Sequence, residues 1–405
     1  MNILIIVQIF ESHSDTGSDR HFFFAKELAK KGHKVNVITS NVDYKKAERR
    51  FKKSFFYRKE IEGINVTYVP AYTKFRGSFL KRILFFVSFF IFSFFEILRL
   101  KDINLIYAVS TPLSNGFLGS IFSFIKKVPL FFEVTDVWPD AAIQTGVIKN
   151  GFIIRISKAM EQIIYKQSQK VICLTEGIKK NIQKKGVASS KIILITNGVD
   201  LKLFPNLTEK EMNIFRVKYK LEKSFNCLYI GAHGLYNSLM TILLAANEIS
   251  HEQGINFILV GDGDEKLKLQ DFASKNNLKN VKFFDPVKRE EAIGILSTAD
   301  IFLLPNRRGT FFEGNLPNKL FDYLAASRPI LVSGYGESAD LVLQAKAGFI
   351  VDAEDYKDFS SKILDLSKFS KTKMNIMGKN GRNFVEKNYN RIDQVEVLSN
   401  LIING

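Results

Sequence analysis

Two series of short apolar segments alternate with helix-like stretches along the chain, and this alternation limits the folds that are possible. The first series comprises residues 3–10, 34–39, 64–69, 105–109, 130–134, 171–174 and 192–195, and the second comprises 226–231, 256–261, 281–284, 300–304 and 329–333. Between the first two segments, an amphipathic stretch over 22–31 ends at Gly32, a residue typical of helix ends. Strands separated by helices favour parallel pairing, so each series predicts a doubly wound parallel sheet.

The length of the chain supports two domains. Its 405 residues exceed what a single hydrophobic core usually serves. We predict an α/β fold with two Rossmann-like, doubly wound domains, the first over 1–204 and the second over 205–378. Residues 379–405 are predicted to form closing helices that cross back to the first domain.

The cysteines and the amino terminus bear on the compartment. Cys173 and Cys227 are the only cysteines, and both lie inside apolar runs. They are therefore predicted to be buried free thiols, which favours a reducing compartment. The apolar run at 3–7 lacks the basic leader and cleavage site of a signal peptide, so it is predicted to be a buried strand. We expect a cytoplasmic protein.

The charge balance predicts an anionic partner. The chain has 58 Lys and Arg against 41 Asp and Glu, a formal net charge of +17. Nucleic acid, an anionic bilayer and phosphorylated small molecules all fit this charge, and a lysine-rich proteome is the alternative explanation. Because no nucleic-acid-binding signature accompanies 37 Phe, we expect no nucleic acid and favour acidic lipid.

One segment combines phenylalanine with positive charge. Residues 83–95 are rich in Phe, and four basic residues precede them: Lys74, Arg76, Lys81 and Arg82. The apolar run is shorter than the roughly 20 residues of a spanning helix. It predicts an amphipathic helix lying in the membrane interface, with the four basic residues facing the lipid. A helix buried within the first domain is the alternative.

The stretch from 313 to 330 has the features of a phosphate site. Asn315 and Pro317 are helix-start signals, and a helix over about 317–326 would point its free N–H groups at the preceding loop. Lys319 and Asp322 are three residues apart and share one face of that helix. An ammonium suits a diphosphate, and a carboxylate accepts hydrogen bonds from ribose hydroxyls. A capped surface helix with ordinary charges is the alternative.

This stretch resembles the carboxy-terminal signature of family 4 glycosyltransferases, whose GT-B fold has two domains facing across a cleft. Counted back from Pro329, Asp322 occupies the second carboxylate position of that signature, whereas Glu313 is one residue too far upstream of the first. The resemblance implies that Asp322 holds the ribose. It also implies that Glu313, with the backbone of Asn315 and Leu316, contacts the transferred sugar and the phosphates.

Two glycine-containing loops resemble the donor-binding loops of the same family. Gly231 and Gly234 flank His233 in the loop that follows the first strand of the second domain. The glycines allow close backbone approach to an anion, and His233 is expected to donate to phosphate, with a structural role as the alternative. Relatives place Arg and Lys in this loop, so here Lys319, with Arg307 or Arg308 as further candidates, must supply the charge. Gly17 occupies the family's Gly-Gly position in the first domain.

Residues 132–140 resemble the Asp-x-Trp-Pro-acid motif of transferases that build O-antigen and capsule precursors. The resemblance implies that Asp136 orients an acceptor hydroxyl or acts as base. It also implies that Trp138 stacks on a sugar ring and that Asp140 contributes to acceptor binding. The alternative is that Asp136 caps a helix and Trp138 only packs.

These features predict a glycosyltransferase of bacterial surface polysaccharide synthesis. The resemblance implies transfer of a UDP-linked N-acetylated hexosamine or deoxyhexosamine to a lipid-linked or saccharide acceptor, with retention of configuration. We expect no metal, because no Asp-x-Asp motif precedes the cleft, and no cofactor beyond the nucleotide-sugar co-substrate. We expect a peripheral protein on the inner face of the plasma membrane. A nucleotide-sugar epimerase of the same fold and a polyanion-binding protein are the alternatives. The oligomeric state is not predicted.

Overall fold

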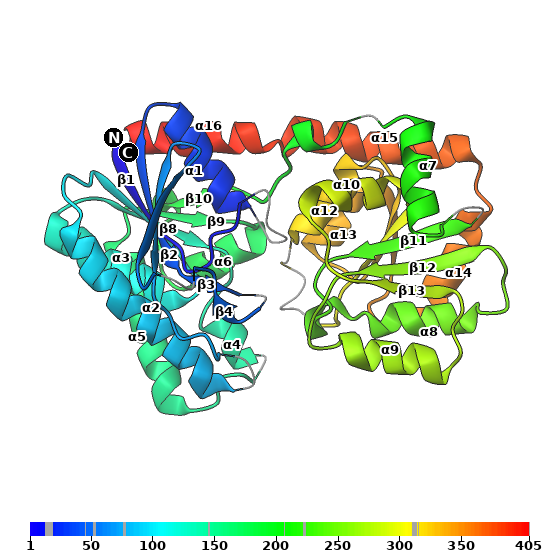
Figure 1. Ribbon diagram of the computed structural model, residues 1–405, viewed down its shortest axis with the longest axis horizontal. Helices are drawn as coiled ribbons and strands as arrows, with labels where there is room; N and C mark the ends of the chain where they lie inside the picture. Colours follow the sequence, from blue (N-terminus) through cyan, green and yellow to red (C-terminus); the bar gives the residue numbers. More distant parts are fainter. Residues whose placement is uncertain are drawn as a thin grey trace. The chain divides into compact units, whose positions relative to one another are not determined.

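The structure is a computed structural model with two compact units. The residues that it describes are 1–12, 19–44, 46–51, 54–75, 78–144, 146–205, 207–221, 224–309, 314 and 316–404. The first unit contains most of the chain up to Thr196 together with Val395–Gly405, and the second contains Asn197–Gln394. The boundary near the carboxyl terminus falls inside helix α16 (Arg391–Asn404). Each unit has its own sheet and its own core (Figure 1).

The first unit is built on an eight-stranded sheet in which only the edge strand β5 runs antiparallel to its neighbour. The strands in sheet order are β10 (Ile192–Leu194), β9 (Lys170–Cys173), β8 (Leu130–Val134), β7 (Leu105–Val109), β1 (Asn2–Ile6), β2 (Lys34–Ser40), β6 (Ile64–Val69) and β5 (Tyr57–Ile61). A separate hairpin pairs β3 (Val42–Asp43) with β4 (Glu48–Arg49). The inner strands β7 and β8 are buried throughout, as parallel strands covered on both faces must be.

Helices cover both faces of this sheet. Alternate residues of β1 separate the faces: Leu4 and Ile6 belong to the main core, whereas Ile3 and Ile5 contact α1 and the end of α16. The helices on the main-core face are α2 (Phe79–Arg99), α3 (Leu113–Lys126), α5 (Gly151–Gln167) and α6 (Glu176–Lys184). The remaining elements of this unit are α1 (Arg20–Lys30), the short α4 (Asp140–Gln144) and η1 (Ser189–Lys191).

The second unit has a six-stranded sheet that is parallel throughout. Its strands in sheet order are β13 (Val281–Phe284), β12 (Ile255–Val260), β11 (Phe225–Ile230), β14 (Ile301–Pro305), β15 (Ile330–Ser333) and β16 (Gly348–Val351). Successive residues of each strand point to opposite faces. Leu228 therefore packs in one core cluster, and its neighbours Cys227 and Tyr229 pack in the other.

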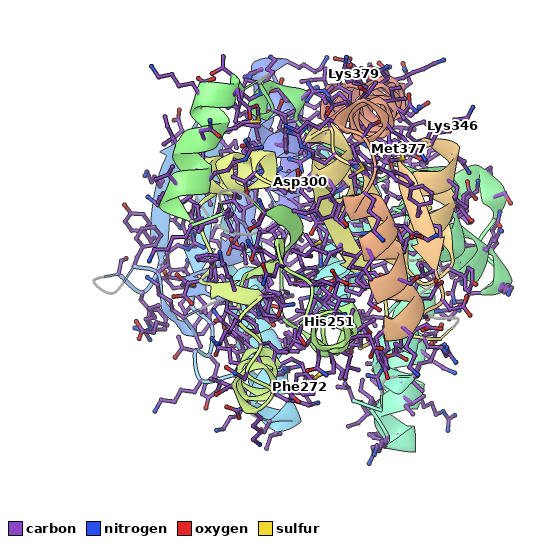
Figure 2. The ribbon with its side chains drawn as sticks, turned by 90° about the vertical axis from the view of Figure 1, so that its right-hand side faces the viewer. His251, Phe272, Asp300, Lys346, Met377 and Lys379 are labelled. Carbon is purple, nitrogen blue, oxygen red and sulfur yellow. The ribbon has the colours of Figure 1, made fainter. Side chains whose placement is uncertain are left out.

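Two helical layers enclose the second sheet. One face carries α7 (Glu209–Lys218), α10 (Arg289–Ser297), α12 (Asn318–Ala325), α13 (Glu337–Gln344) and α15 (Lys371–Asn388). The other carries α8 (Met240–Glu248), α9 (Lys266–Lys275) and α14 (Tyr356–Ser367). Two short elements, η2 (Leu201–Leu203) and η3 (Leu235–Asn237), complete the unit. Phe272 of α9 and Met377 of α15 are labelled in Figure 2. Both pack against the core cluster that contains Cys227 and Tyr229.

The strand order reverses once in each sheet. In the first sheet the reversal lies between β1 and β7, and in the second between β11 and β14. Ligands of open α/β sheets bind outside the carboxyl ends of the strands at such a switch point. The structure confirms the predicted α/β class with two doubly wound sheets, and the switch points direct attention to the loops that follow these strands.

Several local predictions have outcomes here. Cys173 and Cys227 are free and buried, as predicted. The helix predicted from the Phe-rich segment is α2, and one of its faces packs into the core. No helix among the described residues combines the length and the apolar character needed to cross a membrane.

Candidate functional site

The loops that follow β11 and β12 touch each other through glycines. Gly231 has φ +149°, and a Cβ there would lie 3.0 Å from Cε of Lys319. Gly261 has φ +146°, and a Cβ there would overlap the carbonyl oxygen of Gly231 at 1.9 Å. A larger residue at either position would separate the two loops or displace the lysine. Gly234, by contrast, has only Asn237 Nδ2 near its Cβ position, at 3.9 Å.

His233 is a fully buried and uncharged residue of the first of these loops. Its backbone N–H donates to the carbonyl of Asp262 at 2.8 Å, which ties the two loops together. Burial, with the nearby Lys266 charge, lowers the pKa of the imidazole to about 4. Neither ring nitrogen has a hydrogen-bond partner in the part of the chain that the structure describes. The neutral ring therefore keeps one buried N–H that has no acceptor among the described residues.

Lys319 lies in the first turn of α12, with Pro317 as the N-cap residue. Its Nζ donates to Tyr229 Oη at 2.5 Å and to Asn237 Oδ1 at 2.8 Å, and it lies 4.2 Å from the centre of the Tyr229 ring. Desolvation lowers the pKa of this ammonium to about 7. No carboxylate among the described residues pairs with it. The second unit therefore holds a half-buried cation whose partners are all neutral.

Asp322 lies one turn further along the same helix, and it is paired. The Arg289 guanidinium donates to both carboxylate oxygens, with N–O distances of 2.7 Å and 2.5 Å. Arg289 opens α10, so this fork joins the start of α10 to the second turn of α12. A carboxylate has about four acceptor positions, so the pairing leaves lone pairs for hydroxyl donors.

Three predicted donor-site residues lie outside the described residues: Gly17, Glu313 and Asn315. Leu316 is buried, and its carbonyl accepts a hydrogen bond from Asn197 Nδ2 at 3.1 Å. Its backbone oxygen is thus used within the second unit.

Sequence reasoning missed the residues that position this site. Tyr229 and Asn237 bind Lys319, and Arg289 binds Asp322. Lys266 links two loops, because its Nζ contacts the Gly261 carbonyl at 2.9 Å and Asp285 at 2.6 Å. The contacts of Tyr229 and Asn237 with Lys319, and of Arg289 with Asp322, join residues distant in sequence, so no local pattern points to them.

In the first unit, Asp136 lies just beyond the carboxyl end of β8. Its Oδ2 is 3.5 Å from Thr111 Oγ1, which follows β7. Desolvation by the surrounding protein raises the pKa of the carboxyl, and the Thr111 hydroxyl opposes that shift, although the side chain itself is exposed. Helix α4 begins four residues later, so Asp136 is not its N-cap. The carboxylate lies near the switch point and is available for a ligand.

The other two residues of this motif have structural contacts. Trp138 is partly buried against the core of the first unit, which fits the packing alternative. Asp140 opens α4 and forms an ion pair with Lys185 at 2.8 Å, supported by Asn181 at 3.4 Å. Asp140 therefore has a cationic partner, whereas the partner of Asp136 is the neutral Thr111 hydroxyl.

A buried charge cluster of the first unit was also missed. Glu133 on β8 accepts from Arg20 at 3.3 Å and from His21 Nε2 at 2.8 Å, and the Tyr107 hydroxyl donates to it. Burial alone would raise the pKa of Glu133, but Arg20 and His21 outweigh it and hold the pKa well below its usual range. Arg20 also donates to the carbonyls of 195 and 196, at 2.8 Å and 2.6 Å. The cluster fixes the start of α1 to the segment that follows β10.

The predicted membrane-facing residues lie before and at the start of α2. Lys74, Lys81 and Arg82 are exposed, and Arg76 lies outside the described residues. No group of three or more His, Cys, Asp or Glu within the described ranges is arranged to hold a metal ion.

Comparison with known proteins identifies the family. Residues 22–203 match the sequence model described as Glycosyltransferase Family 4, and residues 224–368 match the one described as Glycosyl transferases group 1. WcaI of Escherichia coli K12, named as a colanic acid biosynthesis glycosyl transferase, is 26% identical over 74% of this chain and 74% of its own. An Escherichia coli enzyme named UDP-Gal:alpha-D-GlcNAc-diphosphoundecaprenol alpha-1,3-galactosyltransferase is 24% identical over 77% of this chain and 78% of its own.

Solved structures show the same fold. HepE from Anabaena, in a complex with UDP-glucose, has a TM-score of 0.76 at 15% identity over 100% of both chains. WaaG, a glycosyltransferase of lipopolysaccharide biosynthesis, has a TM-score of 0.72 at 15% identity over 100% of both chains. The chain is a glycosyltransferase, and it belongs to family 4 of the glycosyltransferases with the GT-B fold.

Proposed function

We propose that the chain transfers a sugar from a UDP-linked donor to a lipid-linked saccharide during the synthesis of a bacterial surface polysaccharide. The observation that carries this proposal is Lys319, a half-buried ammonium with neutral partners beside the close Gly231 backbone. A cation held without a counter-charge at the start of a helix is suited to a diphosphate. The names of the relatives supply the chemical class, since they include a UDP-galactose transferase acting on a diphosphoundecaprenol acceptor.

The proposed donor site assigns a role to each described residue. Lys319 neutralises the diphosphate, the loop at Gly231 and Gly234 approaches it, and His233 donates one ring N–H. Asp322 accepts hydrogen bonds from the ribose while Arg289 holds its carboxylate in place. Glu313 and the backbone of Asn315 and Leu316 keep the roles toward the sugar that the family resemblance implies.

The proposed chemistry is substitution at the anomeric carbon with loss of the nucleoside diphosphate. Negative charge develops on that diphosphate as the glycosyl bond breaks, so Lys319 and the N–H groups aimed at it stabilise the transition state. Asp136 orients the acceptor hydroxyl, with Trp138 and Asp140 bordering the acceptor position. We propose retention of configuration, an N-acetylated hexosamine or deoxyhexosamine as the sugar, and no requirement for a metal ion.

A thermal-shift and calorimetric panel of UDP, GDP and dTDP sugars tests the donor proposal. We expect binding of UDP and UDP sugars, and loss of that binding in Asp322→Ala. Normal donor affinity in Asp322→Ala would overturn the site assignment. Transfer of labelled sugar from the bound donor to a polyprenyl-diphosphate saccharide tests the reaction, and production of a free epimerised nucleotide sugar would favour the epimerase instead.

We further propose that the protein acts at the inner face of the plasma membrane, where a lipid-linked acceptor would be found. The exposed side chains of Lys74, Lys81 and Arg82 support this location. The competing polyanion-binding protein would instead retain DNA on a filter with a steep dependence on salt concentration.

A further inference from the structure

Helix α2 is apolar on two faces, and only one of them is covered. On the covered face, Phe85, Phe89 and Ile97 are almost completely buried in the first unit. On the other face, six large apolar side chains are between 45% and 67% exposed: Leu80, Leu84, Val87, Ile91, Phe95 and Leu98. They recur every three or four residues, so they form one continuous stripe, about 27 Å long at the rise of an α-helix. Packing within the unit does not explain this stripe.

Two neighbouring helices extend the exposed apolar surface. Helix α3 is largely buried and contacts both α2 and α5, so α2 and α5 form the outside of one layer (Figure 1). On α5, Phe152, Ile156 and Ile163 are between 44% and 72% exposed. At the end of α3, Phe124 is 75% exposed and Ile125 is 52% exposed. These eleven side chains are called the outer apolar face below.

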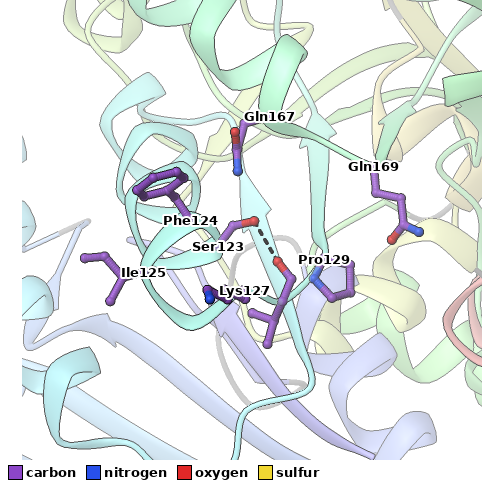
Figure 3. Close-up of a pocket in the computed structure, with 8 residues that line it drawn as sticks. Ser123, Phe124, Ile125, Lys127, Pro129, Gln167 and Gln169 are labelled. Carbon is purple, nitrogen blue, oxygen red and sulfur yellow. Dashed lines mark hydrogen bonds between the residues drawn. The ribbon is translucent and has the colours of Figure 1, made fainter.

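An open hollow adjoins this face where α3 ends. It has a volume of about 730 Å³ and lies between the ends of α3 and α5, beside the start of β8 (Figure 3). Phe124, Ile125 and Lys127 line it, together with Gln167. Because this is the amino end of the strand, the hollow is remote from the carboxyl edge where Asp136 lies and has no part in the proposed chemistry.

The unpaired exposed charges on the three helices of the outer apolar face are of one sign. Seven basic side chains near it are exposed and have no ion-pair partner in the described part of the chain: Lys74, Lys81, Arg82, Lys127, Arg155, Lys158 and Lys166. The acidic residues of α2 and α5 are Glu96 and Glu161, and both are buried and paired with basic side chains. Helix α3 has no acidic residue. The exposed charge of this layer is therefore entirely positive.

We propose that the outer apolar face enters the interface of an anionic bilayer, with α2 lying in the membrane plane and the seven cations contacting lipid phosphates. An apolar stripe bordered mainly by cations complements such a surface, which offers acyl chains beneath a layer of negative headgroups. A second copy of this chain fits less well, because its own copy of this face would bring like charges together. The inference rests on the proposed lipid-linked acceptor, and it specifies the face that the enzyme would use to reach it.

Vesicle flotation tests the face directly. The variant Ile91→Gln/Phe95→Gln removes the centre of the stripe, and Ile214→Gln/Leu267→Gln removes comparable exposed side chains of the second unit, which are 61% and 76% exposed. With vesicles of phosphatidylglycerol and phosphatidylcholine, we expect the first variant to bind at least about tenfold more weakly and the second to bind as the wild type does. Unchanged melting temperatures exclude misfolding. Equal vesicle binding by all three proteins would overturn the inference.

Site-specific labelling measures insertion. The two natural cysteines are fully buried, so a thiol-reactive environment-sensitive dye would label Leu84→Cys selectively, with exposed Lys275→Cys as the control. On vesicles we expect a blue shift and quenching by acyl-chain quenchers for the first dye and neither for the second. A dye at position 84 that stays in water on bound vesicles would overturn the inference. So would a stable dimer that Ile91→Gln/Phe95→Gln dissociates while vesicle binding persists.

The failure of this inference is distinguishable from failure of the proposed function. If stripe variants bind vesicles normally while UDP binding and transfer to the lipid-linked acceptor persist, the face is wrong and the function stands. If the stripe variants lose vesicle binding but the wild type neither binds UDP nor transfers sugar, the face stands and the function is wrong.

Discussion

The two units treat a half-buried or buried charge in opposite ways. In the first unit, Glu133 is surrounded by Arg20, His21 and Tyr107, so its charge is fully compensated within the unit. Among the described residues of the second unit, the partners of Lys319 are the phenol oxygen and ring of Tyr229 and the amide oxygen of Asn237. A compensated charge serves the fold, because its partners are already present. An uncompensated charge costs stability, and a ligand of opposite charge recovers that cost.

The largest expected effect comes from breaking the compensated cluster. Glu133→Gln leaves the Arg20 guanidinium buried without its counter-charge, and we expect a loss of about 3–5 kcal/mol in the free energy of unfolding. Urea denaturation measures it. The surface pair of Glu62 with Lys26 provides the control, since Glu62→Gln should cost no more than about 1 kcal/mol. A similar small loss for both variants would remove the structural role of the cluster.

Removing the uncompensated charge of Lys319 should weaken ligand binding without lowering the free energy of unfolding. Lys319→Met is expected to weaken UDP binding by about 10- to 150-fold, the range for hydrogen bonds to a charged group, without lowering stability. The folded state holds the pKa of this lysine below that of the unfolded chain, so the charge opposes folding at neutral pH. Calorimetry with UDP and urea denaturation measure the two effects. Lys185→Met, which breaks a compensated pair in the first unit, should leave UDP affinity unchanged. Loss of stability with normal UDP affinity in Lys319→Met would contradict the comparison.

The same comparison predicts a dependence of donor binding on pH. The free enzyme has a pKa of about 7 at Lys319, and bound diphosphate favours the protonated form. UDP affinity should therefore be highest below pH 7 and fall by up to about tenfold for each pH unit above it, until the raised pKa of the complex is reached. Titrations from pH 6 to 9 measure this slope, and it should be absent in Lys319→Met. A pH-independent affinity would mean that Lys319 does not contact the phosphates.

The repeated apolar strands made most of the fold predictable from sequence. Strands at 64–69, 105–109, 130–134 and 281–284 have the predicted limits, because each is a short run rich in β-branched and apolar residues. Two of the four edge strands of the large sheets, β5 and β16, were missed. β5 is polar and exposed along its middle. β16 has only a short apolar run, which follows closely after the end of α13 and is therefore difficult to recognise as a separate strand. An edge strand buries less surface, so its sequence has a weaker signal.

The site residues could be predicted from sequence only where neighbouring residues in the chain determine their position. The position of Lys319 at a helix start follows from Pro317, and the close approach at Gly231 follows from a glycine after a strand. Arg289 and Asn237 were missed, because the contacts that they make with Asp322 and Lys319 span 33 and 82 residues. Such partners are brought together by the sheet order and not by sequence spacing.

The smallest expected effect concerns the neutral partners of the uncompensated charge. Tyr229→Phe keeps the ring beneath Lys319 but removes the hydroxyl oxygen that accepts from its Nζ at 2.5 Å. Losing one acceptor destabilises the ammonium, so we expect its pKa to fall further and UDP affinity at pH 7.5 to weaken by about two- to tenfold. The decline in affinity should then begin at a lower pH than in the wild type. Tyr323→Phe, whose hydroxyl accepts from the Ile230 N–H and does not contact the lysine, is the matched control. If both variants shift the pH profile equally, the hydroxyl of Tyr229 has no specific role in positioning Lys319.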